Sequence, residues 1–146
     1  MKASEGGGSR RIAVLFLCRH NAVRSQMAEA LLRAHFSDEF EAASAGTSQA
    51  SVHPLTLQVL DEIGIPTAAL RSKDVGELAD RSFDVVVTVC GQDEPSCPFF
   101  PGGAQLHHAF DDPSANTRSQ EELVAAFRRT RDAIDAWIRV AFAAGG

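Results

Sequence analysis

The stretch LFLCRHNAVRSQMAEALL, residues 15–32, sets one cysteine between an apolar run and a charged segment with helical spacing. The apolar run covers residues 12–17 and is typical of a strand that is buried on both faces of a parallel sheet. Residues 25–36 carry apolar side chains at helical spacing. The stretch therefore predicts a strand, then a loop that begins at Cys18, then a helix.

The rest of the chain repeats this alternation of strands and helices. Residues 53–63 predict a helix that stops at Gly64, and Ser119 with Glu122 forms the S-x-x-E capping box that begins a final helix. Further strands are predicted at residues 40–45, 84–89 and 105–110. These elements predict an α/β fold, a three-layer sandwich with a central, mostly parallel four-stranded sheet.

Composition and charge limit the classes of protein. The 146 residues, 45% of them hydrophobic, suit a single domain over residues 10–146, preceded by a polar, Gly-rich flexible tail at residues 1–9. The net charge of -5 argues against nucleic acid or an anionic membrane as a partner, and no apolar run is long enough for a membrane span or a signal peptide. We therefore expect a cytoplasmic protein whose three cysteines serve catalysis or redox chemistry rather than a disulfide framework.

Cys18 is predicted to be a nucleophile, because it follows a buried strand at the edge where open α/β sheets bind ligands. Its C-x5-R spacing to Arg24 lets successive backbone N–H groups surround an oxyanion while the guanidinium holds two of the oxygens. The N-terminus of the helix favours both a bound dianion and the thiolate form of Cys18. The predicted oxyanion-binding residues are Arg19, His20, Asn21, Ala22, Val23 and Arg24.

Two neighbouring residues fit this interpretation of the loop. The hydroxyl of Ser25 can donate a hydrogen bond to the sulfur, and Asn21 is expected to adopt the left-handed conformation because the loop has no glycine. The alternative is that Cys18 is a buried small hydrophobic residue and Arg24 a solvated helix residue.

A second pair of thiols follows the strand predicted at residues 84–89. Cys90 ends that strand and is therefore expected at the same sheet edge as Cys18. Cys97 lies seven residues on, across a polar, turn-rich segment that can bring both thiols within disulfide range. Cys90 can equally be a structural strand-end cysteine. A zinc site is disfavoured, because the spacing is not C-x2-C and no second ligand pair is present.

The motif FDDP, residues 110–113, supplies a candidate acid. A carboxylic acid on such a loop can protonate a leaving oxygen, although Asp-Pro is also a common turn signal. His107 and His108 would point to opposite faces of a strand, so at most one of them faces the site. Three other histidines show no metal-binding spacing and are interpreted as surface or loop residues: His20, His35 and His53.

The C-x5-R-S loop, the VVTVC segment with a second cysteine in CPFFPGG, and FDDP together resemble the thioredoxin-coupled arsenate reductases. That family shares the fold of the low-molecular-weight protein tyrosine phosphatases. The resemblance spans nearly everything from Ile12 to the final helix. It implies that the Cys18 thiolate attacks arsenate, that Asp112 rather than Asp111 protonates the departing oxygen, and that an arseno-cysteine forms.

The resemblance also implies a relay of thiols. Cys90 would attack Cys18 and release arsenite, Cys97 would then attack Cys90, and thioredoxin would reduce the exposed disulfide. No bound cofactor is expected. The loop sequence RHNAV is similar to that of actinobacterial-type relatives, some of which use mycothiol, so the mycothiol/mycoredoxin system is the alternative external reductant.

Some members of this family hold a potassium ion near the loop. The residues that would align with that site are Asn21, Glu29, Ser44 and Lys73. Because an ammonium group repels a cation and can take its place, we predict no potassium requirement and no metal site.

Two other functions use the same residues. A low-molecular-weight protein tyrosine phosphatase would need only the anion-binding loop and the acid. A non-enzymatic thiol redox sensor would need only the cysteines. The Cys90/Cys97 pair, which the phosphatases typically lack, favours the arsenate reductase.

Overall fold

The computed structural model describes residues 11–47, 51–90, 99–114 and 119–143. Strands and helices alternate along the chain, as the sequence predicts. The elements in chain order are β1 (Ile12–Leu17), α1 (Arg24–Phe36), β2 (Phe40–Ala45), α2 (Pro54–Asp61), the short 3-10 helix η1 (Val75–Leu78), β3 (Val85–Thr88), β4 (Ala104–His107) and α3 (Gln120–Ala141). The short helix η1 was not predicted from the sequence.

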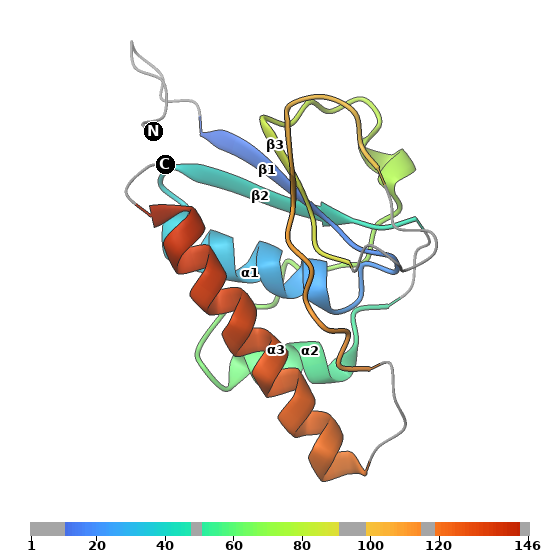
Figure 1. The fold of residues 1–146 in the computed structure, drawn as a ribbon, viewed down its shortest axis with the longest axis vertical. Helices are drawn as coiled ribbons and strands as arrows, with labels where there is room; N and C mark the ends of the chain where they lie inside the picture. Colours follow the sequence, from blue (N-terminus) through green and yellow to red (C-terminus); the bar gives the residue numbers. More distant parts are fainter. Residues whose placement is uncertain (1–10, 48–50, 91–98, 115–118, 144–146) are drawn as a thin grey trace.

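The four strands form one sheet in the order β2-β1-β3-β4, and every neighbouring pair is parallel. The predicted fold class is therefore confirmed, with a sheet that is wholly rather than mostly parallel. Leu17, the last residue of β1, is paired with Ala45 on one side and Thr88 on the other. The carboxyl ends of these strands consequently meet at one edge of the sheet (Figure 1).

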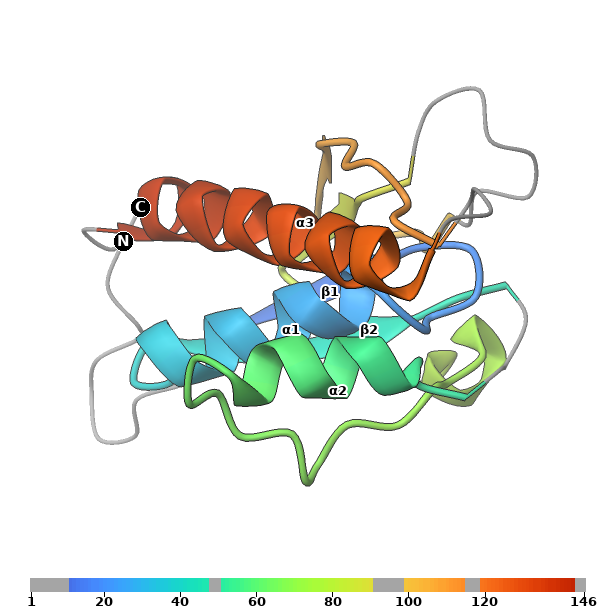
Figure 2. The ribbon, with the colours of Figure 1, turned by 90° about the horizontal axis from the view of Figure 1, so that it is seen from below.

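The strand β1 is buried on both faces, because its alternate side chains enter two different cores. Val14 and Phe16 pack with α1, α2 and α3, and α1 lies between α3 and α2 (Figure 2). Leu15 and Leu17 pack on the other face against η1 and Phe100. This layering fixes the end of β1 and the start of α1 relative to each other.

The predicted bounds differ from the structure mainly at the ends of elements. The strand predicted at 105–110 is Ala104–His107, an edge strand whose four residues are all exposed. The helix predicted at 53–63 is Pro54–Asp61, with His53 as its N-cap. The predicted capping box of Ser119 and Glu122 is present at the start of α3. In the described part of the chain, no helix combines the length and apolar character needed to cross a membrane.

Candidate active site

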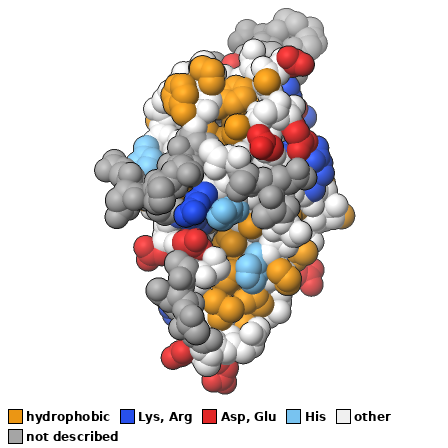
Figure 3. All heavy atoms as spheres, turned by 90° about the vertical axis from the view of Figure 1, so that its right-hand side faces the viewer, with side chains coloured by type: hydrophobic (Ala, Val, Ile, Leu, Met, Phe, Trp, Pro, Cys, Tyr) orange, Lys and Arg blue, Asp and Glu red, His pale blue; other side chains and the backbone are white. Residues whose placement is uncertain are grey.

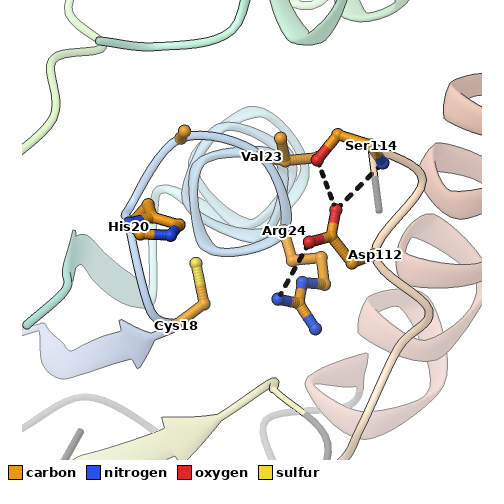
Figure 4. Close-up of a pocket in the computed structure, with 7 residues that line it drawn as sticks. Cys18, His20, Val23, Arg24, Asp112 and Ser114 are labelled. Atoms are coloured by element: carbon orange, nitrogen blue, oxygen red, sulfur yellow. Dashed lines mark hydrogen bonds and ion pairs between the residues drawn. The ribbon is translucent and has the colours of Figure 1, made fainter. Parts of the chain in front are cut away.

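The nucleophile loop, residues 18–23, joins the end of β1 to the start of α1. Cys18 and Arg24 are 3% and 4% exposed, and both side chains reach one pocket beyond the strand ends. The pocket contains about 270 Å³ of space, part of it open to solvent. Its lining residues are Cys18, His20, Ala22, Val23, Arg24, Asp112 and Ser114 (Figure 4). The other two predicted oxyanion-binding residues, Arg19 and Asn21, are not among them.

Asn21 organises the loop from behind the pocket. It is fully buried and has a φ of 55°, the left-handed conformation that the sequence predicts. Its Nδ2 donates to Ser25 Oγ (2.8 Å) and Ser44 Oγ (2.9 Å). Its Oδ1 accepts from the backbone N–H of Lys73 (2.7 Å) and from Gln26 Nε2 (3.0 Å). These bonds compensate for the backbone strain at Asn21.

Ser25 connects Asn21 to the sulfur. Its Oγ lies 2.9 Å from Cys18 Sγ. Because this oxygen already accepts a hydrogen bond from Asn21, its own proton can point towards the sulfur. A thiolate carries no proton, so Ser25 is the donor whenever Cys18 is ionised.

The acid loop, residues 110–114, lies on the other side of Arg24. Arg24 donates to the carbonyl oxygen of Phe110 (3.1 Å), and its NH2 lies 3.7 Å from Asp112 Oδ2. Asp112 Oδ1 accepts from the backbone N–H (3.0 Å) and hydroxyl (2.7 Å) of Ser114. Asp112 lines the pocket, whereas Asp111 is exposed outside it. The structure thus places Asp112, of the two acids, beside Arg24 (Figure 4).

The segment of residues 71–75 and the end of β2 hold the nucleophile loop from outside. Ser72 Oγ donates to the carbonyl of His20 (3.1 Å), and Gln26 Nε2 donates to the carbonyl of Arg71 (2.8 Å). Gly46 packs so closely that a Cβ there would lie 2.7 Å from two carbonyl oxygens of the loop. This support could not be predicted from the sequence, because residues 71–75 carry no periodic pattern.

Buried charge extends behind the loop. Glu29, which is 3% exposed, accepts from Ser44 Oγ (2.5 Å), pairs with Arg33, and lies 3.7 Å from Lys73 Nζ. Burial lowers the pKa of Lys73, and the negative charge of Glu29 opposes that effect. The four residues that the resemblance connects with potassium, Asn21, Glu29, Ser44 and Lys73, thus lie together. The absence of a potassium requirement stays a prediction.

Cys90 lies at the same sheet edge as Cys18, as predicted. The backbone N–H of Val89 donates to the carbonyl of Leu17 (2.9 Å), so Cys18 and Cys90 follow adjacent strands. Cys90 is fully buried and disulfide-bonded, whereas Cys18 is free, so that disulfide does not include Cys18. Cys97 lies outside the described residues.

Two histidines have more specific places than the surface or loop position that was predicted for them. His20 is exposed on the loop, but it is also one of the residues that line the pocket, and its ring lies near the Cys18 sulfur (Figure 4). His53 caps α2, accepts from the N–H of Leu55 (3.0 Å) and packs 4.7 Å from the Phe127 ring. Burial lowers the pKa of His53, and the charge of Asp112 opposes this. The sequence signal that could have predicted this place for His53 was its position directly before Pro54, where a helix N-cap is expected.

The remaining histidines lie away from the pocket. His108 stacks on Trp137 with ring centroids 5.0 Å apart, and His35 pairs with Asp135 (2.7 Å). His107 is exposed on β4. The face at the strand ends carries basic, acidic and histidine side chains between two hydrophobic areas (Figure 3). Within the described residues, no cluster of three His, Cys, Asp or Glu side chains could hold a metal ion.

Comparison with known proteins shows that the chain is similar to two kinds of protein. The family model described as low molecular weight phosphotyrosine protein phosphatase matches residues 13–143. An arsenate reductase of Halalkalibacterium halodurans is 37% identical over 83% of this chain and 88% of that protein. An arsenate reductase of Bacillus subtilis is 34% identical over the same shares.

Solved structures of arsenate reductases are also similar to this chain. A thioredoxin-dependent arsenate reductase of Corynebacterium glutamicum has a TM-score of 0.64 and 30% identity, over 92% of this chain and 65% of that one. An arsenate reductase in the phosphate binding state has a TM-score of 0.74 and 23% identity, over 88% of this chain and 94% of that one, and supports the fold.

Proposed function

This chain belongs to the low molecular weight phosphotyrosine protein phosphatase family, and we propose that it is an arsenate reductase with Cys18 as the nucleophile. The observation that carries this proposal is the pocket itself. Cys18 Sγ lies 2.9 Å from a hydroxyl donor, and Arg24 and Asp112 line the same pocket. A nucleophile, a fixed cation and an acid are the groups that attack on an oxyanion requires.

In the first step, the Cys18 thiolate attacks the arsenic atom of arsenate. The loop N–H groups and the Arg24 guanidinium hold the substrate oxygens and stabilise the negative charge of the transition state. Asp112 donates its proton to the departing oxygen, which leaves as water. The product is an arsenic(V) adduct on Cys18 Sγ.

In the second step, Cys90 attacks Cys18 Sγ. A sulfur–sulfur bond forms, and the electron pair of the broken sulfur–arsenic bond stays on arsenic, which leaves as arsenite. Cys97 then attacks Cys90, which releases Cys18 as a thiolate and leaves a Cys90–Cys97 disulfide. A free Cys18 together with a disulfide-bonded Cys90 agrees with the end of this relay.

An external dithiol must then reduce the disulfide. We propose thioredoxin as this reductant, because the Corynebacterium glutamicum structure at 30% identity is a thioredoxin-dependent enzyme. Mycothiol with mycoredoxin is the alternative. No bound cofactor enters the scheme, since the thiols supply both electrons.

The first experiment measures arsenate-dependent NADPH consumption with thioredoxin and thioredoxin reductase, beside hydrolysis of an aryl phosphate. We expect turnover with arsenate and its loss in Cys18→Ser, Cys90→Ser and Cys97→Ser. Turnover only with mycothiol and mycoredoxin would identify that system, instead of thioredoxin, as the reductant. No arsenate turnover with either system would overturn the proposal.

A phosphatase is the second candidate, because every group that it needs already lines the pocket, whereas Cys90 is not among the lining residues. Cys90→Ser separates the two activities. Arsenite production should be abolished while aryl phosphate hydrolysis is largely retained. Equal loss of both activities would contradict the thiol relay.

A further inference from the structure

We propose that His20 is a specificity-determining residue whose imidazole narrows the mouth of the pocket, so that a bare tetrahedral oxyanion is accepted and its esters are disfavoured. This inference rests on the proposed function, since it concerns the substrate class of the same site. It assigns a role to the side chain of His20, beyond the backbone N–H that the loop contributes.

The pocket has a buried floor and an exposed mouth. Cys18 and Arg24 form the floor and are 3% and 4% exposed. His20 and Ser114 are exposed, and the Asp112 side chain is 31% exposed. Because all five residues line one pocket, the exposed ones mark its opening.

His20 lies on the other side of this opening from Asp112. In Figure 4, its imidazole and the Asp112 carboxylate stand on opposite sides of the Cys18 sulfur. The main chain at His20 is fixed, because its carbonyl accepts from Ser72 Oγ (3.1 Å) and the next residue is the buried, left-handed Asn21. The backbone therefore fixes where the His20 side chain begins, and its ring lies beside the Cys18 sulfur in Figure 4.

The mouth is where arsenate and a phosphate ester differ. In-line attack by Cys18 points the departing oxygen away from the sulfur, towards the opening. In arsenate this oxygen carries at most a proton, whereas in an ester it carries a carbon group that must pass between His20 and Asp112. Bulk at this position therefore acts against the ester and leaves the smaller substrate unaffected.

The test measures kcat/KM for arsenate and for 4-nitrophenyl phosphate in His20→Ala, His20→Ser and His20→Gln. We expect the two small replacements to raise the ratio of ester to arsenate kcat/KM about tenfold, the scale of discrimination by pocket volume. His20→Gln, which keeps most of the bulk, should leave the ratio close to that of the wild type. His107→Ala, an exposed histidine on β4 outside the pocket, is the matched control.

Two outcomes would overturn the proposal. In the first, kcat/KM for arsenate and kcat/KM for the ester change by the same factor in His20→Ala and His20→Ser. In the second, His20→Gln changes the ratio of the two kcat/KM values as much as the two small replacements do. If the wild type does not reduce arsenate, the proposed function fails, but His20 is still tested. The comparison then uses kcat/KM for the ester against the inhibition constant of inorganic arsenate, and the same tenfold change is expected.

Discussion

The two sides of the pocket are held in very different ways. On the nucleophile loop, Asn21 is fully buried and forms hydrogen bonds with α1, with β2 and with the segment of residues 71–75. On the acid loop, Asp112 is 31% exposed, and the hydrogen bonds to its carboxylate come from Ser114, only two residues away. Long-range contacts fix Asn21, and local hydrogen bonds orient the Asp112 carboxylate, although Arg24, Val89 and Thr130 hold the backbone of the acid loop.

This difference corresponds to the different tasks of the two sides. Stabilising a developing charge requires donors that are in place before the reaction, so that none of them has to reorganise. Under the proposed mechanism, Asp112 donates a proton in the first step only, and a carboxylate that is oriented by local hydrogen bonds suffices for that task. Arg24 joins the two sides, because it bonds to Phe110 and lies 3.7 Å from Asp112.

The largest effect is expected for Arg24→Gln, which removes the cation at the junction. We expect kcat/KM for arsenate to fall about 1000-fold, the scale of losing a transition-state donor. Circular dichroism should show an intact fold, and Arg139→Gln, an exposed residue of α3, should be nearly silent. A loss below tenfold would mean that the loop N–H groups alone hold the anion.

A smaller effect is expected on the acid side. Asp112→Asn should lower kcat about 100-fold with little change in KM, because it removes the proton donor and leaves the anion-binding loop intact. Asp111→Asn, at the exposed neighbour, should stay within about twofold of the wild type. Equal losses in the two variants would show that the acid loop shifts enough for either carboxylate to serve.

Stability should distinguish the two sides as well. Asn21→Ala leaves buried partners without their hydrogen bonds and puts alanine in the left-handed conformation, so we expect a loss of about 3 kcal/mol. Ser114→Ala removes only an exposed local bond and should cost less than about 0.5 kcal/mol. Urea denaturation measures both values. Similar losses would remove the contrast between the long-range hydrogen bonds of Asn21 and the local ones of Asp112.

The nucleophile loop could be predicted from the sequence better than the acid loop. The strand, loop and helix around Cys18 were predictable because burial on both faces and helical spacing leave a strong periodic pattern. Even the conformation of Asn21 followed, since a loop without glycine has few residues that tolerate a positive φ. Asp112 could be separated from Asp111 only by resemblance, because adjacent acids before a proline carry no periodicity.

The support of the loop could not be predicted, because it depends on contacts between segments that are distant in sequence. Lys73 bonds to Asn21 across 52 residues, and Gly46 meets the loop where a Cβ would clash. Neither residue belongs to a local motif. Such contacts appear only when the sheet brings β2 and residues 71–75 beside the end of β1.

The smallest expected effect tests whether the two sides of the pocket interact electrostatically. Burial lowers the pKa of His53, and the charge of Asp112 partly opposes this, so Asp112→Asn should lower that pKa further. His53 also anchors the nucleophile loop, since its backbone N–H donates to the carbonyl of Ala22 (3.1 Å).

The shift also affects stability. Because the pKa of His53 is lower in the folded chain than its ordinary value of 6.5, the unfolded chain binds the proton more readily, and the free energy of unfolding decreases as pH falls below 6.5. This decrease should be steeper in Asp112→Asn, where a charged His53 has lost its attraction to the carboxylate. NMR titration of the His53 ring in the wild type, Asp112→Asn and Asp111→Asn measures the shift directly. An unchanged pKa in Asp112→Asn would place the acid loop farther from the nucleophile loop in solution, and the rate loss in that variant would then require closure of the acid loop on the substrate.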